Sequence, residues 1–147
     1  MNKRVNMHIE DLETQLIKLL KDSGQFKSVK RYAGELERDG LLRSTAGNIP
    51  AAMVFTAGIE DSLGKEDCIG IDQLPAETLT LMVILMVSAD PEHSRFHELR
   101  RLVRNTLDGF DAEGELPLPL VNVKTDALAI TATVSVYAMQ YNCEIYS

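Results

Sequence analysis

The stretch that most constrains the fold is ETLTLMVILMVSA, residues 77–89, which is the most continuous apolar run of the chain. Leu79 and Leu81 alternate with threonines at its start, and from there onward both faces of an extended chain become apolar. A strand that is apolar on both faces has to be covered on both faces, so the pattern predicts a central strand of a sheet. The run is also far too short to cross a bilayer as a helix, and we therefore expect no membrane partner.

Period-two alternation on both sides of this run predicts further strands. Residues 26–32 predict a short edge strand, and residues 49–57 predict a strand that begins at its proline, because proline cannot donate a hydrogen bond to a central ladder. Further along the chain, residues 120–124 predict a strand and Thr125-Asp126 predicts a turn.

The segment 127–141 alternates over about twelve positions, roughly twice the usual strand length. We expect one face, formed by alternate residues from Leu128 to Ala138, to pack on helices, and the other face to be small and polar. A strand of this length can extend beyond its own sheet, and its free end is then available to another subunit.

Two stretches show the periodicity of amphipathic helices. One is 8–22, with an apolar stripe that includes Leu12 and Leu16, and the other is 93–109. The order of elements predicts an α+β domain, with a mostly antiparallel sheet of about four to five strands and two main helices packed on one face. We expect residues 1–147 to form a single domain, in which the polar and acidic stretch 59–76 is an extended loop or arm.

The charge balance narrows the classes of partner. The 147 residues carry a formal net charge of −7, which disfavours general binding to duplex DNA or anionic membranes, because both require a basic surface. The N-terminal stretch has no apolar signal core, and Cys68 and Cys143 form no CxxC pair. We therefore expect reduced thiols and a product made in the cytoplasm.

The sequence contains none of the catalytic or phosphate-binding motifs GxSxG, GxxxxGKS/T, GxGxxG and HExxH. His93 and His97 lie four positions apart on a predicted helix, but a metal site needs more ligands and a second shell around them. Asp67 lies beside Cys68, and a neighbouring carboxylate weakens a thiol as a nucleophile. We expect no enzymatic activity, no cofactor and no metal.

The second predicted helix carries RFHELRRLVRN, residues 95–105, which concentrates positive charge in an acidic chain. Its apolar side chains fall in one arc of the helical wheel, with Arg100 and Arg104 beside that arc and Arg101 farther round. A solvated face is one interpretation, in which Arg104 pairs with Asp108 at i, i+4. A protein interface is the second, because arginine binds carboxylates in a bidentate manner, and nucleic acid is the third.

The interface hypothesis identifies both a basic and an acidic surface. Arg100, Arg101 and Arg104 form what we call the arginine shoulder, and the acidic counterpart is the loop 60–72 or the carboxylates at 111–115. In a ring, each shoulder would meet the acidic loop of the next subunit, which is a head-to-tail contact. The candidate interface residues are Arg100, Arg101, Arg104, Glu66, Asp67, Tyr137 and Tyr141.

The chain resembles the short proteins of the Mu-like myophage tail cluster that are thought to be tail terminators. The resemblance rests on the helix IEDLETQLIKLL leading to a strand that ends in YAGEL, and on the proline-led strand PAAMVFTAG. It continues with an apolar strand followed by RRLVRNTLDGF and with a long strand at the C-terminus. These features cover most of the chain in the same order, and residues 59–76 match least.

The resemblance implies a structural role in a phage virion. Tail terminators form a hexameric ring on the last ring of the tail tube, stop its polymerisation and present a surface to the head connector. It also implies a sheet with helices on one side, a homo-oligomer, a location at the head-proximal end of the tail, and partners among tube, sheath and connector proteins. DNA would only pass through the lumen. The alternatives are another connector or baseplate ring, a small-ligand-binding α+β domain, and a nucleic-acid-binding module.

Overall fold

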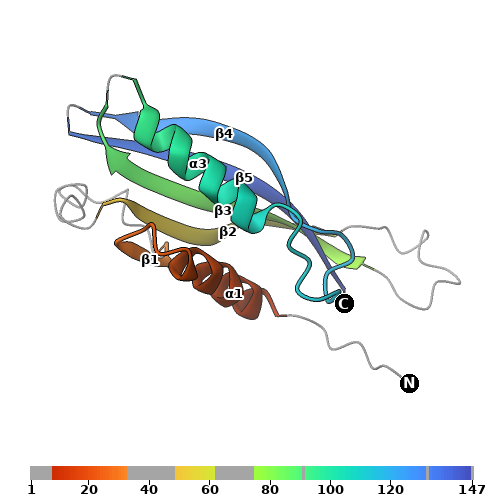
Figure 1. The fold of residues 1–147 in the computed structure, drawn as a ribbon. Coiled ribbons are helices and arrows are strands. Elements are labelled where there is room, and N and C mark those ends of the chain that lie inside the picture. Colours follow the sequence, from red (N-terminus) through yellow and green to blue (C-terminus); the bar gives the residue numbers. More distant parts are fainter. Residues whose placement is uncertain (1–7, 33–48, 62–74, 91, 132, 147) are drawn as a thin grey trace, which may run out of the picture.

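The computed structural model describes residues 8–32, 49–61, 75–90, 92–131 and 133–146, and its centre is a twisted sheet (Figure 1). Five strands pair in the order β1-β2-β3-β5-β4, where β1 is Ser28–Arg31, β2 is Ala51–Asp61, β3 is Pro75–Ser88, β4 is Val121–Ile130 and β5 is Val134–Tyr146. The β1–β2 pair is parallel and the other three pairs are antiparallel. Helices α1, Ile9–Asp22, and α3, Ser94–Leu107, cover one face, which confirms the predicted α+β class.

One large apolar core lies between the helices and the sheet. Leu81, Val83 and Leu85 of β3 point into it and are 0% exposed. The helices contribute the stripes that their periodicity predicts, namely Leu12, Leu16 and Leu20 from α1 and Phe96, Leu99, Val103 and Leu107 from α3. Full burial of such a side chain contributes about 1.5–3 kcal/mol, so this interface is the main source of stability for both helices.

Alternate residues of the same strands build a second apolar cluster on the face away from the helices. Met53 of β2, Ile84 and Met86 of β3, and Val136 of β5 are at most 2% exposed. β3 also has a neighbouring strand on each side. The prediction of a central strand that is covered on both faces is therefore confirmed.

The predicted long strand 127–141 is wrong, because the chain reverses inside it. β4 passes straight through the predicted turn, with Thr125 opposite Met139 and Asp126 opposite Ala138. The reversal lies between Ile130 and Val134, where Thr131 Oγ1 accepts a hydrogen bond of 2.9 Å from the Val134 backbone N–H. A threonine side chain thus closes a turn that has no glycine, proline or asparagine to signal it.

The predicted orientation of this segment is also wrong. The helix-facing residues of β5 are Tyr137, Met139, Tyr141, Cys143 and Ile145, whereas Val134 and Val136 belong to the cluster on the opposite face. Both faces of β5 are apolar along this part, so alternation alone could not decide which face the helices cover. The larger aromatic and sulfur-containing side chains fill the space beneath α3.

The predicted loop 59–76 contributes residues to two strands. β2 continues to Asp61 and β3 begins at Pro75, and the two strands pair with Asp61 opposite Glu77. Residues 62–74, which include Glu66, Asp67 and Cys68, lie outside the described residues.

Candidate functional site

The outer edge of β4 is the first candidate interaction surface. β4 pairs with β5 on one side and, as the last strand in the order, has no strand partner on its other side within the described chain. An unpaired strand edge offers a row of backbone N–H and C=O groups to another chain. Its two ends carry apolar side chains that are about half exposed, namely Val121 (58%), Val123 (51%), Leu128 (52%) and Ile130 (54%). We call this strand edge with its four apolar side chains the open edge.

Polar and irregular features lie along the open edge. Lys124 Nζ and Asp126 Oδ2 form an ion pair of 3.4 Å near its centre, and the register shifts between Asn122 and Lys124 and again between Ala127 and Ala129. Charged residues and bulges are the usual means by which proteins prevent uncontrolled edge pairing. The open edge therefore combines apolar ends with features that limit edge-to-edge pairing.

An apolar groove of about 460 Å³ lies beside the start of β4. One side of its lining is formed by Leu118, Pro119, Val121 and Val123. The start of β3 and the end of β5 contribute the rest. Leu118 is 57% exposed, so the groove extends the apolar surface of the open edge.

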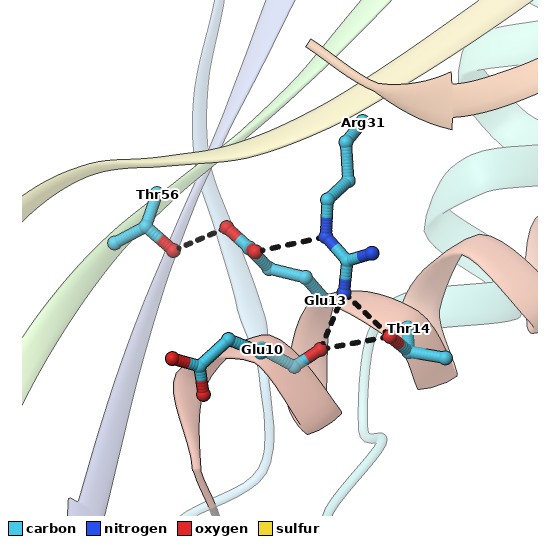
Figure 2. A network of polar contacts seen from close by, with 5 residues as sticks. All are labelled: Glu10, Glu13, Thr14, Arg31 and Thr56. Carbon is cyan, nitrogen blue, oxygen red and sulfur yellow. Dashed lines mark hydrogen bonds and ion pairs between the residues drawn. The ribbon is translucent and has the colours of Figure 1, made fainter. Parts of the chain in front are cut away.

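The opposite edge of the sheet, at β1, is bound to α1 by a polar network (Figure 2). Arg31 Nε lies 3.2 Å from Glu13 Oε1, and Arg31 Nη2 donates to the Glu10 backbone carbonyl at 2.6 Å and to the Thr14 hydroxyl. Thr56 of β2 donates to the other oxygen of Glu13 at 2.9 Å. The Glu13 side chain is 13% exposed, so one largely buried carboxylate connects α1, β1 and β2.

The three residues of the arginine shoulder have different surroundings. Arg104 Nε lies 3.2 Å from Asp108 Oδ2, which confirms the predicted i, i+4 pair. Arg100 Nε donates a long hydrogen bond of 3.4 Å to Thr125 Oγ1 on β4. Arg101 is exposed and has no polar partner among the described residues. Arg100 is thus the arginine that lies between α3 and the open edge.

A second groove, of about 270 Å³, runs between α3 and β4. It is lined by Phe96, His97 and Arg100 from α3 and by Thr125, Ala127 and Tyr137 from the sheet. The Phe96 and Tyr137 rings stack with centroids 3.5 Å apart at 16°, and this stack forms its apolar wall. We call this feature the α3–β4 groove.

The start of α3 holds this groove in place. Asp90 Oδ2 accepts hydrogen bonds from the backbone N–H and the hydroxyl of Ser94, and Asp90 Oδ1 accepts one from the Glu92 N–H. These bonds lower the pKa of the Asp90 carboxyl, the Glu92 bond contributing most. His93 has a positive φ of 55°, and its Nδ1 forms a 2.8 Å hydrogen bond with the Tyr137 hydroxyl. The bond orients the Tyr137 ring against Phe96.

Tyr141 lies in the core rather than at the surface, since it is 1% exposed. Burial raises the pKa of its phenol, and the neighbouring Asp108 carboxylate raises it further. Within the described residues, neither the Tyr141 hydroxyl nor Asp108 Oδ1 has a hydrogen-bond partner of normal geometry. Burial likewise raises the pKa of the Cys143 thiol to about 12. Its side chain therefore remains a protonated, buried thiol at neutral pH.

The described residues contain no group of three or more His, Cys, Asp or Glu side chains arranged to hold a metal ion. His93 precedes the first residue of α3, and its Nδ1 bonds to the Tyr137 hydroxyl. Neither described helix has the length and apolarity needed to cross a membrane. The side chains along this surface offer charged, aromatic and apolar contacts.

The structure brings together some of the predicted site residues and separates others. Arg100 and Tyr137 line the same groove, Arg104 is occupied by Asp108, and Tyr141 is buried. Sequence reasoning missed Phe96 and Thr125 as groove residues, because nothing local indicates that they meet across the helix–strand interface. It also missed the open edge, although the alternation in LVNVK was a signal for it.

Neither the protein-family models nor the curated proteins that were searched contain a match to this chain.

Proposed function

We propose that this protein is a structural subunit that assembles into a ring, as a phage tail terminator does at the head-proximal end of the tail tube. The observation that carries the proposal is the open edge, a ten-residue strand with four half-exposed apolar side chains. The resemblance of the sequence to the tail-terminator proteins and the sheet with both helices on one face support it. In this role the ring stops polymerisation of the tube and joins it to the connector.

The energetics of the open edge favour a subunit contact. Full burial of a valine, leucine or isoleucine side chain contributes about 1.5–3 kcal/mol. Each of the four side chains is about half exposed, so burial of its remaining surface would contribute about half of that free energy. Together they offer roughly 4 kcal/mol, to which added backbone hydrogen bonds contribute. A stable contact also needs the buried area of a normal subunit interface, and the rest of that area has to come from other surfaces of the two copies.

The asymmetry of the two sheet edges favours a ring over a two-fold dimer. β1 is a four-residue strand bonded to α1, whereas β4 is a ten-residue strand with an apolar border. When the open edge contacts a different surface on the next copy, the contact is head-to-tail, and such contacts form a ring when the rotation from copy to copy closes. The net charge of −7 suits a ring through which DNA passes without being gripped.

Light scattering coupled to size-exclusion chromatography, followed by negative-stain electron microscopy, tests the proposal. We expect a concentration-dependent oligomer with a central hole, and binding of that oligomer to the ends of purified tail tubes. Binding along the tube wall, or a strict monomer at all concentrations with and without tubes, would contradict it. Location in the virion by labelled antibody separates a terminator from another connector ring or a baseplate ring.

A small-ligand-binding domain is the second candidate, and the apolar groove of about 460 Å³ beside Leu118 and Val121 is the observation that favours it. Grooves of this size and lining accommodate apolar ligands. Under this alternative the protein stays monomeric and a fluorescent apolar probe binds with one-to-one stoichiometry. Under the ring proposal, assembly occupies the adjoining edge and reduces that binding.

A further inference from the structure

The α3–β4 groove contains a guanidinium whose hydrogen-bonding capacity is mostly unused. Arg100 has five N–H donors, and the bond to Thr125 Oγ1 at 3.4 Å is its hydrogen bond within the described chain. The lining of the groove includes no carboxylate, since the other lining residues are Phe96, His97, Thr125, Ala127 and Tyr137. Asp126, the nearest acidic residue along β4, pairs with Lys124.

These surroundings select a carboxylate as the ligand. An arginine fork matches the two oxygens of a carboxylate, and the stacked Phe96 and Tyr137 rings lower the local dielectric and so strengthen the attraction. The volume of about 270 Å³ is that of a site for a side chain, smaller than the usual site for a drug-sized molecule. Nucleic-acid binding needs a row of phosphate contacts, whereas this groove offers one arginine.

The chain itself presents carboxylates in a preformed loop directly after α3. Asp111, Glu113 and Glu115 are exposed, and none of them forms an ion pair with a described residue. The loop is held by backbone hydrogen bonds from Gly114 and Leu116 to the Asp111 carbonyl, and Leu116 is 4% exposed. We call residues 111–115 the acidic knuckle. A loop ordered before binding loses little conformational entropy when it docks.

The helix residues that line the α3–β4 groove belong to the first half of α3, whereas the acidic knuckle follows the end of the helix. Arg100 is separated from Leu107, the last residue of the helix, by about two turns, or roughly 10 Å at 1.5 Å per residue. A knuckle therefore reaches a groove most directly when the two belong to different copies. This arrangement gives a head-to-tail contact, the same symmetry class that the two unlike sheet edges favour.

We propose that Arg100 in the α3–β4 groove of one copy binds a carboxylate of the acidic knuckle of the next copy. The inference rests on the proposed function, because it supplies the polar half of the subunit contact whose apolar half is the open edge. The groove fixes the register of the contact, and like-charged neighbours oppose incorrect docking.

Charge reversal tests the contact by analytical ultracentrifugation of the full chain. Arg100→Glu is expected to weaken self-association at least tenfold, and so is a triple variant with Asp111, Glu113 and Glu115 each changed to Lys. Combining both sets of changes in one chain restores association, because the charges are exchanged rather than lost. Arg95→Glu is the matched control, since Arg95 pairs with Glu98 at 3.2 Å outside the groove, and it leaves association within twofold. Circular dichroism and the thermal midpoint verify that each variant is folded.

The outcomes separate this inference from the proposed function. If the wild-type chain assembles and Arg100→Glu assembles equally well, the groove contact is wrong and the ring proposal stands. If both charge-reversal variants fail to associate and their combination does not rescue them, the acidic knuckle is not the occupant. If the wild-type chain never assembles, the ring proposal fails. In that case a cyclic peptide of residues 110–118 tests the groove alone by NMR, and equal shifts in wild-type and Arg100→Glu protein would overturn it.

Discussion

The two edges of the sheet show opposite ways of dealing with an exposed strand. The β1 edge is four residues long and is tied to α1 through Arg31, Glu13 and Thr56. The β4 edge is ten residues long and exposes four apolar side chains, with charges only near its centre. The chain therefore stabilises one edge by its own helix, while the other edge has no covering element within the described residues.

The same difference appears where each helix joins the sheet. At α1 the carboxylate of Glu13 has a donor on each oxygen. At α3 the Tyr141 hydroxyl and Asp108 Oδ1 are buried without a hydrogen-bond partner of normal geometry in the described chain. Both helices depend mainly on apolar packing, but the polar joint at α1 is satisfied, whereas the α3 side contains buried polar atoms without such partners. The contrast leads to four predictions.

The strongest test of the contrast is to make the open edge as polar as the β1 edge. Val121→Lys combined with Ile130→Lys removes roughly 2 kcal/mol of apolar burial from each subunit contact, which corresponds to about thirtyfold weaker association. Ile59→Lys is the control, because Ile59 is 51% exposed but lies on β2, away from the open edge. Sedimentation equilibrium measures the difference. Equal association constants for the double variant and the wild type would remove the open edge as an interface.

The second prediction concerns the polar network that ties the β1 edge to α1. Glu13→Ala removes the acceptor of both Arg31 and Thr56, and we expect the free energy of unfolding to fall by about 1–2 kcal/mol. The exposure of the Arg31 side chain, 47%, keeps the loss below that of a buried ion pair. Urea denaturation measures it. Glu10→Ala is the matched control, because Arg31 binds the backbone carbonyl of Glu10 and the bond survives the change. Similar losses in the two variants would contradict the role of Glu13.

The third prediction concerns the stability of the fold at alkaline pH, which depends on Cys143 in the buried core of β5. Burial raises the pKa of the Cys143 thiol from 9.0 to about 12, so the folded state holds its proton more tightly than the unfolded state. This contribution to stability is fully present below pH 9 and is lost as the pH rises from about 9 to about 12, at up to roughly 1.4 kcal/mol per pH unit. Cys143→Ala should show a shallower decline above pH 9 in urea titrations. Parallel slopes for variant and wild type would refute the assignment.

The smallest effect is expected at Arg104. Its ion pair with Asp108 is 45% exposed on the arginine side, and pairs of this kind contribute about 0.3–0.5 kcal/mol. Arg104→Ala should therefore change the free energy of unfolding by no more than about 0.5 kcal/mol, and high salt should abolish the difference. A loss above 2 kcal/mol would show that Arg104 supports the buried pair of Asp108 and Tyr141.

The helices and the central strand could be predicted from sequence with little error. The apolar arc of α3 contains Phe96, Leu99 and Val103, which are all buried in the structure, and the run at 77–89 is the middle strand of the sheet. These predictions succeed because periodicity within a short segment reflects burial on one or both of its faces. The Arg104–Asp108 pair succeeded for the same reason, since i, i+4 neighbours meet on any helix.

The candidate site was only partly predictable. Arg100 was identified because its charge stands out in an acidic chain, but its groove depends on Thr125 and Tyr137, which come from two other strands. The predicted turn at Thr125-Asp126 concealed β4 as a continuous edge strand, and the true reversal uses the side chain of Thr131. Tyr141 looked available on a free strand end and lies in the core instead.

Local sequence patterns sufficed for both helices, the central strand, the α+β class and the chemical character of each segment, because these follow from a few neighbouring residues. The tertiary structure alone decided which strand became the open edge, which face of β5 met the helices, and which arginine lay in a groove. Those outcomes depend on strand pairings between residues far apart in the chain. Where both faces of a strand are apolar, as in β5, only the competition among long-range packing arrangements selects one of them.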